Sequence, residues 1–159
     1  MIESILTPSR IFFATTKASA GRRLLQSKRN AMLLVDVLRS CIGDGKFQLH
    51  DFVVMPDHVH LLMTVNVDMT IERRCSWSRG DFLTASKREH GYLGEVWQRG
   101  FSEVQVMNHT SFETHRAYIA MNPVKAGSVD RPEDFPYCFG SLARKKLESS
   151  KIIEEKVED

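Results

Sequence analysis

Two strand-forming segments separated only by Pro56 and Asp57 constrain the fold more than any other feature of this sequence. The segments Phe47–Met55 (FQLHDFVVM) and His58–Val65 (HVHLLMTV) are rich in β-branched and aromatic residues, which favour strands. Proline beside aspartate is typical of a tight turn. The pattern therefore predicts two strands joined by a short turn.

Two more strands and three helices are predicted around this pair. The strands are marked by β-branched, aromatic and alternating apolar residues, and the helices by apolar residues three and four positions apart. The expected ranges are 10–18 and 101–107 for the strands, and 22–42, 69–90 and 111–122 for the helices. We expect Ser111 to cap the last helix and Pro123 to end it, because proline disfavours helical geometry in the residue before it.

The order of these elements indicates the fold class. Strand, helix, strand, strand, helix, strand is the split βαβ order of the ferredoxin-like fold. The sequence therefore predicts an α+β protein with a ferredoxin-like βαββαβ antiparallel sheet and an added C-terminal helix. Because this fold hosts many functions, the function has to be argued from particular residues.

Length and charge limit the class of protein. The chain has 159 residues, so we expect one domain at 1–147 and a charged, flexible tail at 148–159. No apolar run reaches the ~18 residues of a membrane helix, and the first residues do not resemble a signal peptide, so we expect a cytoplasmic protein with no membrane partner. Of 22 basic and 20 acidic residues, the tail holds two and five, which leaves the rest of the chain with a net charge of +5. A moderately basic body suits a phosphate-bearing partner.

The sequence His58–Val59–His60 is the strongest candidate for a chemical site. Side chains alternate along a strand, so both histidines lie on one face and Val59 lies on the other, toward the core. Neutral imidazole is the commonest metal ligand, and two imidazoles at this spacing can bind one divalent cation. A pair of hydrogen-bonded structural histidines would show the same pattern, and the pattern alone does not decide between the two.

A second candidate lies on the last predicted helix. Tyr118 and Asn122 are four residues apart and therefore share a helix face. A divalent cation held by the two histidines and the Asn122 amide oxygen would set a phosphodiester beside the Tyr118 hydroxyl, the nucleophile of a transesterification. A covalent tyrosyl phosphate conserves the ester energy, so no nucleotide cofactor is needed. The alternative is a core tyrosine with Asn122 as a C-terminal cap.

The segment Glu95–Phe101 (EVWQRGF) combines groups that suit nucleic acid. Trp97 can stack on bases, while Gln98 and Arg99 can contact the backbone. Lys125, which follows the second candidate site, is a further candidate for contacting DNA. The alternative is a loop that Trp97 anchors and that leads into the last strand.

Four strings of residues resemble the REP-associated tyrosine transposases, which belong to the HUH single-stranded-DNA transposases. The strings are, in order, FVVMPDHVHLLM, GEVWQRGF, YIAMNPVKAG and RPEDFPY, and the resemblance runs from about Arg10 to Ser141. HUH stands for histidine, hydrophobic residue, histidine. One string alone would be a weak signal, whereas four in the right order are specific.

The resemblance implies a function and a role for each candidate. It implies a ferredoxin-like sheet with a catalytic helix, and an enzyme that cleaves and rejoins single-stranded hairpin DNA with a guide sequence at the foot of the hairpin. The reaction leaves a 5′-phosphate on a tyrosine and a free 3′-hydroxyl, and Tyr118 matches that nucleophile. The implied cation is magnesium or manganese, and its ligands match His58, His60 and, as a third, Asn122. Monomer and homodimer are both left open.

The stretch Glu72–Ser86 departs from the family pattern. The family has a smooth amphipathic helix with lysine-glycine near its end, whereas this chain has RRCSWSRGDFLTAS at 73–86. Either this copy has drifted or the stretch encodes a short out-of-frame segment. Two alternatives to an active enzyme are a catalytically inactive relative that binds hairpin DNA and a ferredoxin-like RNA-binding module. The usual strand signature of the RNA-binding module is absent.

Overall fold

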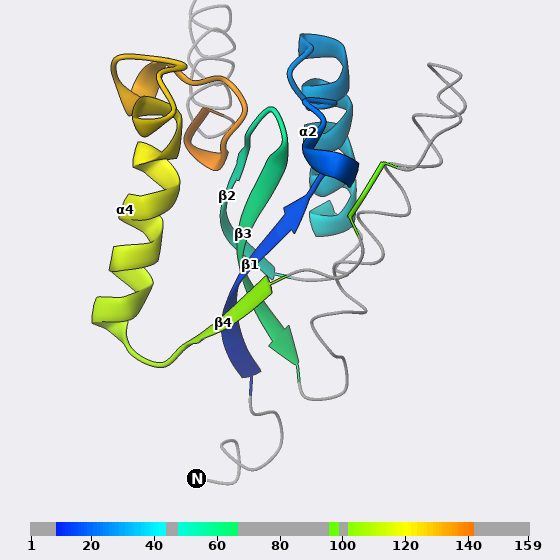
Figure 1. Ribbon diagram of the computed structural model, residues 1–159. Coiled ribbons are helices and arrows are strands. Elements are labelled where there is room, and N and C mark those ends of the chain that lie inside the picture. Colours follow the sequence, from blue (N-terminus) through cyan, green and yellow to red (C-terminus); the bar gives the residue numbers. More distant parts are fainter. Residues whose placement is uncertain (1–8, 44–47, 67–95, 99–101, 142–159) are drawn as a thin grey trace, which may run out of the picture.

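A four-stranded antiparallel sheet lies between two helices in the computed structural model, which describes residues 9–43, 48–66, 96–98 and 102–141 (Figure 1). The strands are β1 (Ser9–Lys17), β2 (Gln48–Val54), β3 (His58–Asn66) and β4 (Ser102–Val106). The helices are α2 (Lys28–Gly43) and α4 (His109–Lys125), with the short 3-10 turns η1 (Ser19–Gly21) and η2 (Pro132–Asp134). Within these ranges, no helix has the length and apolar character needed to cross a membrane.

The strands are ordered β2-β3-β1-β4, and each neighbouring pair is antiparallel. This order and polarity are those of a split βαβ chain, in which β1 and β2 are joined by a helix and β2 and β3 by a hairpin. The four predicted strands and the antiparallel sheet are confirmed, and every strand end lies within one residue of its expected position. The helix predicted at 69–90 and the tail predicted at 148–159 lie outside the described residues.

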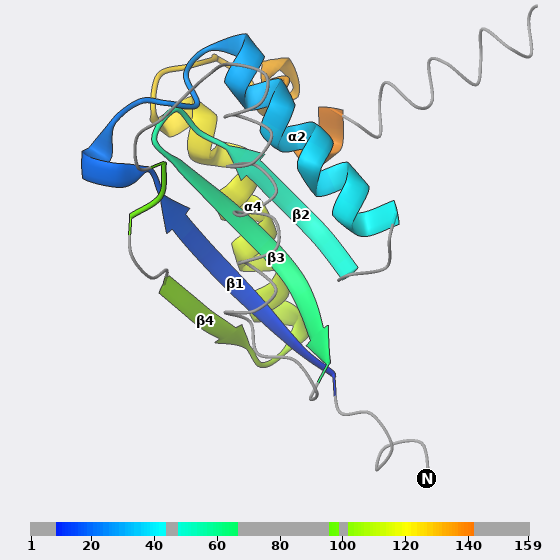
Figure 2. The same ribbon diagram turned by 90° about the vertical axis from the view of Figure 1, so that its right-hand side faces the viewer.

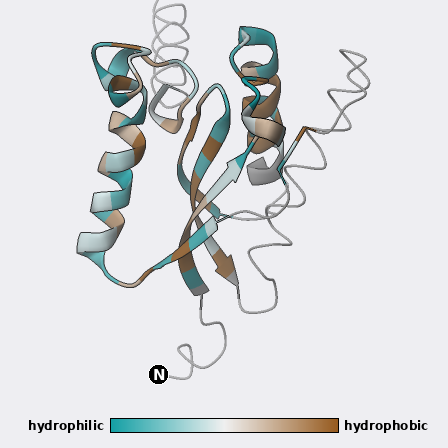
Figure 3. Cartoon of the chain, in the orientation of Figure 1, coloured by the Kyte–Doolittle hydropathy of each residue, from teal (hydrophilic) through white to brown (hydrophobic). Residues whose placement is uncertain are grey.

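The helices α2 and α4 cover opposite faces of the sheet, as Figure 2 shows. Side chains alternate along β3, so Val59 and Leu61 belong to the hydrophobic cluster under α2, whereas Leu62 belongs to the cluster under α4. In Figure 3, α4 carries both hydrophobic and hydrophilic residues. His58 and His60 have the same parity as Leu62 and therefore lie on the face that α4 covers.

The first predicted helix begins six residues later than expected, as α2. Ser27 caps it, with its hydroxyl oxygen 3.2 Å from the backbone nitrogen of Asn30. Leu25, which the apolar spacing counted as helical, is buried in a loop instead, and its N–H donates to the Pro56 carbonyl at 2.9 Å. The loop between β1 and α2 is thereby bound to the turn that precedes β3.

The helix α4 begins earlier and ends later than predicted. Its N-cap is Asn108 and not Ser111, because the Asn108 side chain accepts a hydrogen bond from the Ser111 N–H at 2.8 Å. Pro123 lies inside α4, so the prediction that it ends the helix is wrong. Proline lacks one donor and biases only the residue before it, and here the last turn is closed by donors that follow it.

A glycine ends α4 instead. Gly127 has a φ of 76°, in the left-handed region that favours glycine. The Ser128 N–H donates to the Pro123 carbonyl at 2.9 Å, and the Gly127 N–H donates to the Val124 carbonyl at 3.0 Å. This pair of bonds is the Schellman motif, which satisfies carbonyls that the helix leaves free.

Replacing Gly127 by alanine should destabilise the protein by about 1 kcal/mol, because alanine is strained at a positive φ. A Cβ atom at this position would meet no atom within 4 Å, so the loss is conformational and not steric. Asparagine tolerates the left-handed region better, and Gly127→Asn should lose less. Urea unfolding of the three proteins measures both losses, and equal losses would contradict the explanation.

A β-bulge in β2 turns two polar side chains toward α4. The register with β3 shifts between Leu49 and Asp51, so His50 is an extra residue in the ladder. The His50 ring centroid lies 5.5 Å from that of Phe112, and an Asp51 carboxylate oxygen lies 3.9 Å from Arg116. Both contacts join the sheet to α4 and fix how that helix lies on it.

Candidate active site

The hairpin of β2 and β3 presents His58 and His60 on one face, as predicted. Their ring centroids are 4.7 Å apart, whereas Val59 is buried on the opposite face. The Met55 N–H closes the turn by donating to the His58 carbonyl at 2.8 Å. The turn therefore fixes the start of β3, and with it the positions of both imidazoles.

Each imidazole has a partner on its Nδ1 atom. The His58 Nδ1–H donates to the Asp57 carboxylate at 2.7 Å, and the His60 Nδ1 lies 2.8 Å from the Thr15 hydroxyl oxygen. A carboxylate only accepts, so this tautomer of His58 leaves its Nε2 lone pair free. A hydroxyl donates or accepts, which allows His60 the same tautomer. Partnered Nδ1 atoms with free Nε2 lone pairs are usual for metal-binding histidines.

The Nε2 atom of His60 is buried, and no described residue offers it a hydrogen bond. A buried polar atom without a partner is rare, because it loses its hydrogen bond to water and gains none in return. Burial, followed by the charges of His58 and Lys17, lowers the pKa of His60 to about 4. At neutral pH the ring is therefore neutral, which is the form that binds a divalent cation.

The helix α4 brings Tyr118 to the histidine pair. The centroid of its ring lies 5.4 Å from that of His60. Phe13 of β1 packs against both rings, with centroid distances of 5.1 Å to His60 and 5.9 Å to Tyr118. Tyr118 is 43 % exposed, so the alternative of a core tyrosine is wrong and a substrate can reach the ring from solvent.

Asn122 and Lys125 lie on the same face of α4 as Tyr118. Together with His58 they line a depression of about 540 Å³, which is within the usual range of ligand pockets. The Lys125 Nζ lies 5.8 Å from the centroid of the Tyr118 ring. Because α4 continues to Lys125, Asn122 is not the C-terminal cap that the sequence also allowed.

The donor set of the site fits a hard divalent cation. Among the residues that the structure describes, no group of three His, Cys, Asp or Glu side chains could hold a metal. A third protein ligand beside His58 and His60 would thus be of another kind, and the amide oxygen of Asn122 is one that Mg²⁺ and Mn²⁺ accept. Two imidazoles and one amide would leave coordination positions of such a cation open to phosphate oxygens.

The segment around Trp97 supports the end of β1. Trp97 is partly buried against the cluster under α2, and its backbone pairs with Ala18 in an isolated bridge. This is the anchoring role that the sequence allowed beside base stacking. Gln98 is exposed, and its N–H donates to the Lys17 carbonyl at 2.8 Å. Arg99 lies outside the described residues.

Three residues that contact the histidine pair were not identified from the sequence. They are Asp57, Thr15 and Phe13. Asp57 could have been found, because it directly precedes His58 and a carboxylate is a common partner of a metal-binding imidazole. Thr15 and Phe13 could not, because their contacts depend on the register that sets Thr15 opposite His60.

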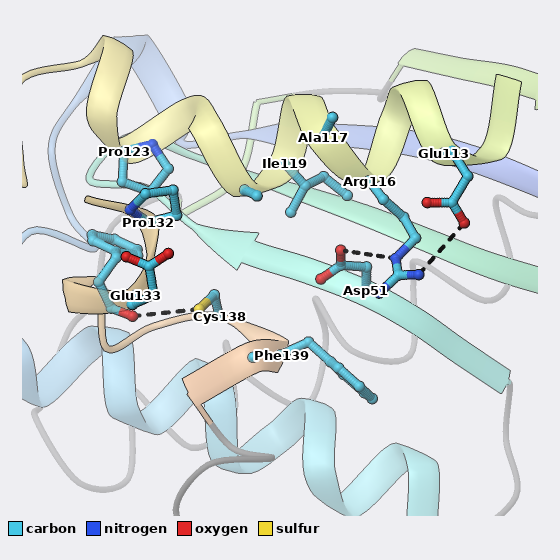
Figure 4. A pocket seen from close by; sticks show the side chains of 13 residues that line it. Asp51, Glu113, Arg116, Ala117, Ile119, Pro123, Pro132, Glu133, Cys138 and Phe139 are labelled. Atoms are coloured by element: carbon cyan, nitrogen blue, oxygen red, sulfur yellow. Dashed lines mark hydrogen bonds and ion pairs between the residues drawn. The ribbon is translucent and has the colours of Figure 1, made fainter. Parts of the chain in front are cut away.

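A second depression, of about 440 Å³, lies between α4, β2 and the segment 132–140 (Figure 4). In it, Arg116 lies between Asp51, at 3.9 Å, and Glu113, at 3.6 Å. The Asp51 side chain is only 15 % exposed, and one of its oxygens accepts from the Phe52 N–H at 2.9 Å. Burial raises the pKa of Asp51 to about 6, against the smaller opposing effects of that hydrogen bond and of Arg116.

The raised pKa of Asp51 predicts a stability change with pH. Between about pH 4 and pH 6 the folded protein keeps this proton while the unfolded chain releases it, so the group makes folding less favourable as the pH rises through that window. Asp51→Asn should therefore stabilise the protein by about 1–2 kcal/mol near pH 7.5, after allowance for the lost ion pair, and by less at pH 4. Urea unfolding at both pH values measures the change. A larger gain at pH 4 would show that this carboxylate is not the cause.

Known proteins resemble this chain over most of its length. A family model described as "Transposase IS200 like" matches residues 16–122. The REP-associated tyrosine transposase of Escherichia coli (strain K12) is 29 % identical over an alignment of 120 residues, which covers 71 % of this chain and 70 % of that protein. A solved structure of a REP-associated tyrosine transposase bound to a REP hairpin is similar with a TM-score of 0.69 and 26 % identity, over 81 % of this chain and 75 % of that one.

The matched family region begins in β1 and ends at Asn122, so it contains both histidines and the tyrosine of the site. It also covers more than half of the chain. This chain therefore belongs to the family of IS200-like transposases.

Proposed function

We propose that this chain cleaves and rejoins single-stranded hairpin DNA by transesterification, through a covalent 5′-phosphotyrosine at Tyr118 and with Mg²⁺ or Mn²⁺ at the histidine pair. The observation that carries the proposal is the position of Tyr118 beside His60, with 5.4 Å between the centroids of their rings. The buried Nε2 atom of His60 has no hydrogen-bond partner among the described residues. The similar proteins are REP-associated tyrosine transposases, one of them bound to a REP hairpin, which supports hairpin DNA as the substrate class.

The histidines would hold the cation through their Nε2 atoms, and Asn122 would add its amide oxygen. When bound, the cation supplies positive charge that polarises a phosphodiester and stabilises a leaving alkoxide. Asp57 keeps His58 in the tautomer that this role needs, and Thr15 can do the same for His60.

Tyr118 supplies the nucleophile. A bond forms between its phenolic oxygen and the scissile phosphorus, and the bond from that phosphorus to the 3′ oxygen of the preceding nucleotide breaks. The phenolic proton passes to solvent, and the leaving oxygen takes up a proton to become a 3′-hydroxyl. One ester replaces another, so no nucleotide cofactor is consumed, and attack of a 3′-hydroxyl on the phosphotyrosine rejoins the strand.

Lys125 and Gln98 are two described side chains that we propose for DNA contact in this reaction. Lys125 brings positive charge next to the Tyr118 ring, and Gln98 is exposed at the end of β1. The partial burial of Trp97 leaves it less ring surface for base stacking than a fully exposed side chain would offer.

Incubation of the full chain with single-stranded hairpin oligonucleotides from the DNA that flanks its own gene tests the proposal. With Mg²⁺ or Mn²⁺, a denaturing gel should show a covalent protein–DNA adduct and a shortened strand, and neither should form with EDTA or with the matching duplex. Hairpin binding without an adduct in either metal would instead identify an inactive hairpin-binding relative.

A further inference from the structure

We propose that Arg23 contacts the DNA backbone at the same site, and that its guanidinium holds the phosphate next to the one that Tyr118 attacks. The inference rests on the proposed function, but it adds a residue from the loop between β1 and α2, remote in sequence from the histidine and tyrosine motifs. Arg23 lines the same depression as His58, Asn122 and Lys125. The side chain is exposed.

The loop that carries Arg23 is attached to the turn that carries the histidines. Two residues after Arg23, the buried Leu25 donates its N–H to the Pro56 carbonyl at 2.9 Å. The Gln26 N–H donates to the Arg23 carbonyl at 3.1 Å and closes a tight turn. These bonds hold the backbone of Arg23 at a set position relative to His58, so less freedom is lost when its side chain binds a ligand.

The charges of the depression favour an anion. Its cationic side chains are Arg23 and Lys125, and its acidic one is Asp57, whose carboxylate already accepts from His58. In the part of the chain that the structure describes, neither Arg23 nor Lys125 forms an ion pair with an acidic side chain. A guanidinium that is not paired with a carboxylate offers two parallel N–H donors, whose planar geometry matches two oxygens of a phosphate.

A single strand fits this arrangement better than an isolated phosphate does. Every nucleotide carries a phosphate, so a strand whose scissile phosphate lies at Tyr118 brings its neighbouring phosphate to the walls of the same depression. Arg23 comes from the loop before α2 and Lys125 from the last turn of α4, so two separate elements contact the strand. Binding would therefore join the Arg23 loop to the helix that carries the nucleophile.

The salt dependence of binding to a fluorescein-labelled oligo-dT of about 20 nucleotides tests the inference. For single strands, each lost phosphate contact reduces the slope of log affinity against log salt by about 0.7. Arg23→Gln should reduce the slope by about that amount and weaken binding about tenfold at low salt. Arg23→Lys should restore the slope and part of the affinity. The matched control is Arg29→Gln, which removes the same charge from an exposed position on α2 and should leave the slope almost unchanged.

An unchanged slope in Arg23→Gln, or equal changes in Arg23→Gln and Arg29→Gln, overturns the inference, and so does a wild-type protein that does not bind oligo-dT. Thermal unfolding midpoints identify a folding defect, which would lower the active fraction without changing the slope. The adduct assay tests the proposed function separately. An adduct with wild type, together with unchanged oligo-dT binding in Arg23→Gln, overturns only the role of Arg23. The expected change in slope without any adduct overturns only the transesterification.

Discussion

Tyr118→Phe should abolish the covalent protein–DNA adduct and leave the protein folded. The substitution removes the hydroxyl that we propose forms the phosphotyrosine bond, and it keeps the ring that packs against His60 and Phe13. Because the ring is 43 % exposed and no cavity opens, the free energy of unfolding should change by less than about 1 kcal/mol. Hairpin binding should be nearly unchanged. A denaturing gel measures the adduct, and urea unfolding measures the stability.

Tyr137→Phe is the matched control. Tyr137 packs partly against both hydrophobic clusters, with its ring centroid 5.6 Å from that of Phe135, and it does not line the depression. The variant should keep the adduct. Tyr92 lies outside the described residues, and Tyr92→Phe is the third variant to be compared in the adduct assay. If Tyr118→Phe still forms the adduct and one of the other two loses it, the nucleophile is that other tyrosine.

His60→Ala should reduce metal-dependent cleavage by about a thousandfold or more, because a bound cation contributes several kcal/mol to the transition state. His58→Ala should have a similar effect, with a smaller risk to folding because its side chain is 24 % exposed. Calorimetric titration with Mn²⁺ gives a second measurement that needs no DNA, and both variants should bind the metal more weakly than wild type does.

His50→Ala is the control for these two substitutions. His50 is also a strand histidine on the α4 face, but it contacts Thr64 and Phe112 and does not line the depression. Its removal should affect stability and leave Mn²⁺ binding unchanged. Metal-dependent cleavage that survives in both His58→Ala and His60→Ala would show that the pair is structural, which is the alternative that the sequence left open.

The sequence predicted the strands more accurately than the helices, and the reason is physical. Strand signals are dense and local here, since the β-branched and aromatic residues of β2 end at Pro56 and glycines precede β2 and β4. The helix boundaries depend on single caps and tertiary contacts. Leu25 has the spacing of a helical residue, but its hydrogen bond to the Pro56 carbonyl holds it in a loop. Pro123 has the sequence of a helix stop, but the Schellman motif at Gly127 lets α4 continue past it.

By itself, the sequence determined which chemical groups share a face. Alternation along a strand is enough to put His58 and His60 together, and the helical period is enough to put Tyr118 beside Asn122. Both arrangements depend on a few consecutive residues only, so they can be predicted without knowledge of the fold. The same local logic placed Val59 toward the core, where it is buried.

Only the tertiary structure decided that these groups meet, and which further residues join them. The 5.4 Å approach of Tyr118 to His60 depends on how α4 lies on the sheet, and the partner of His60 depends on the register that puts Thr15 opposite it. Arg23 reaches the same depression only because its loop is bound to the turn before His58. These contacts join residues far apart in the chain, and the free energy that selects them comes from burying both faces of the sheet at once, which no local pattern encodes.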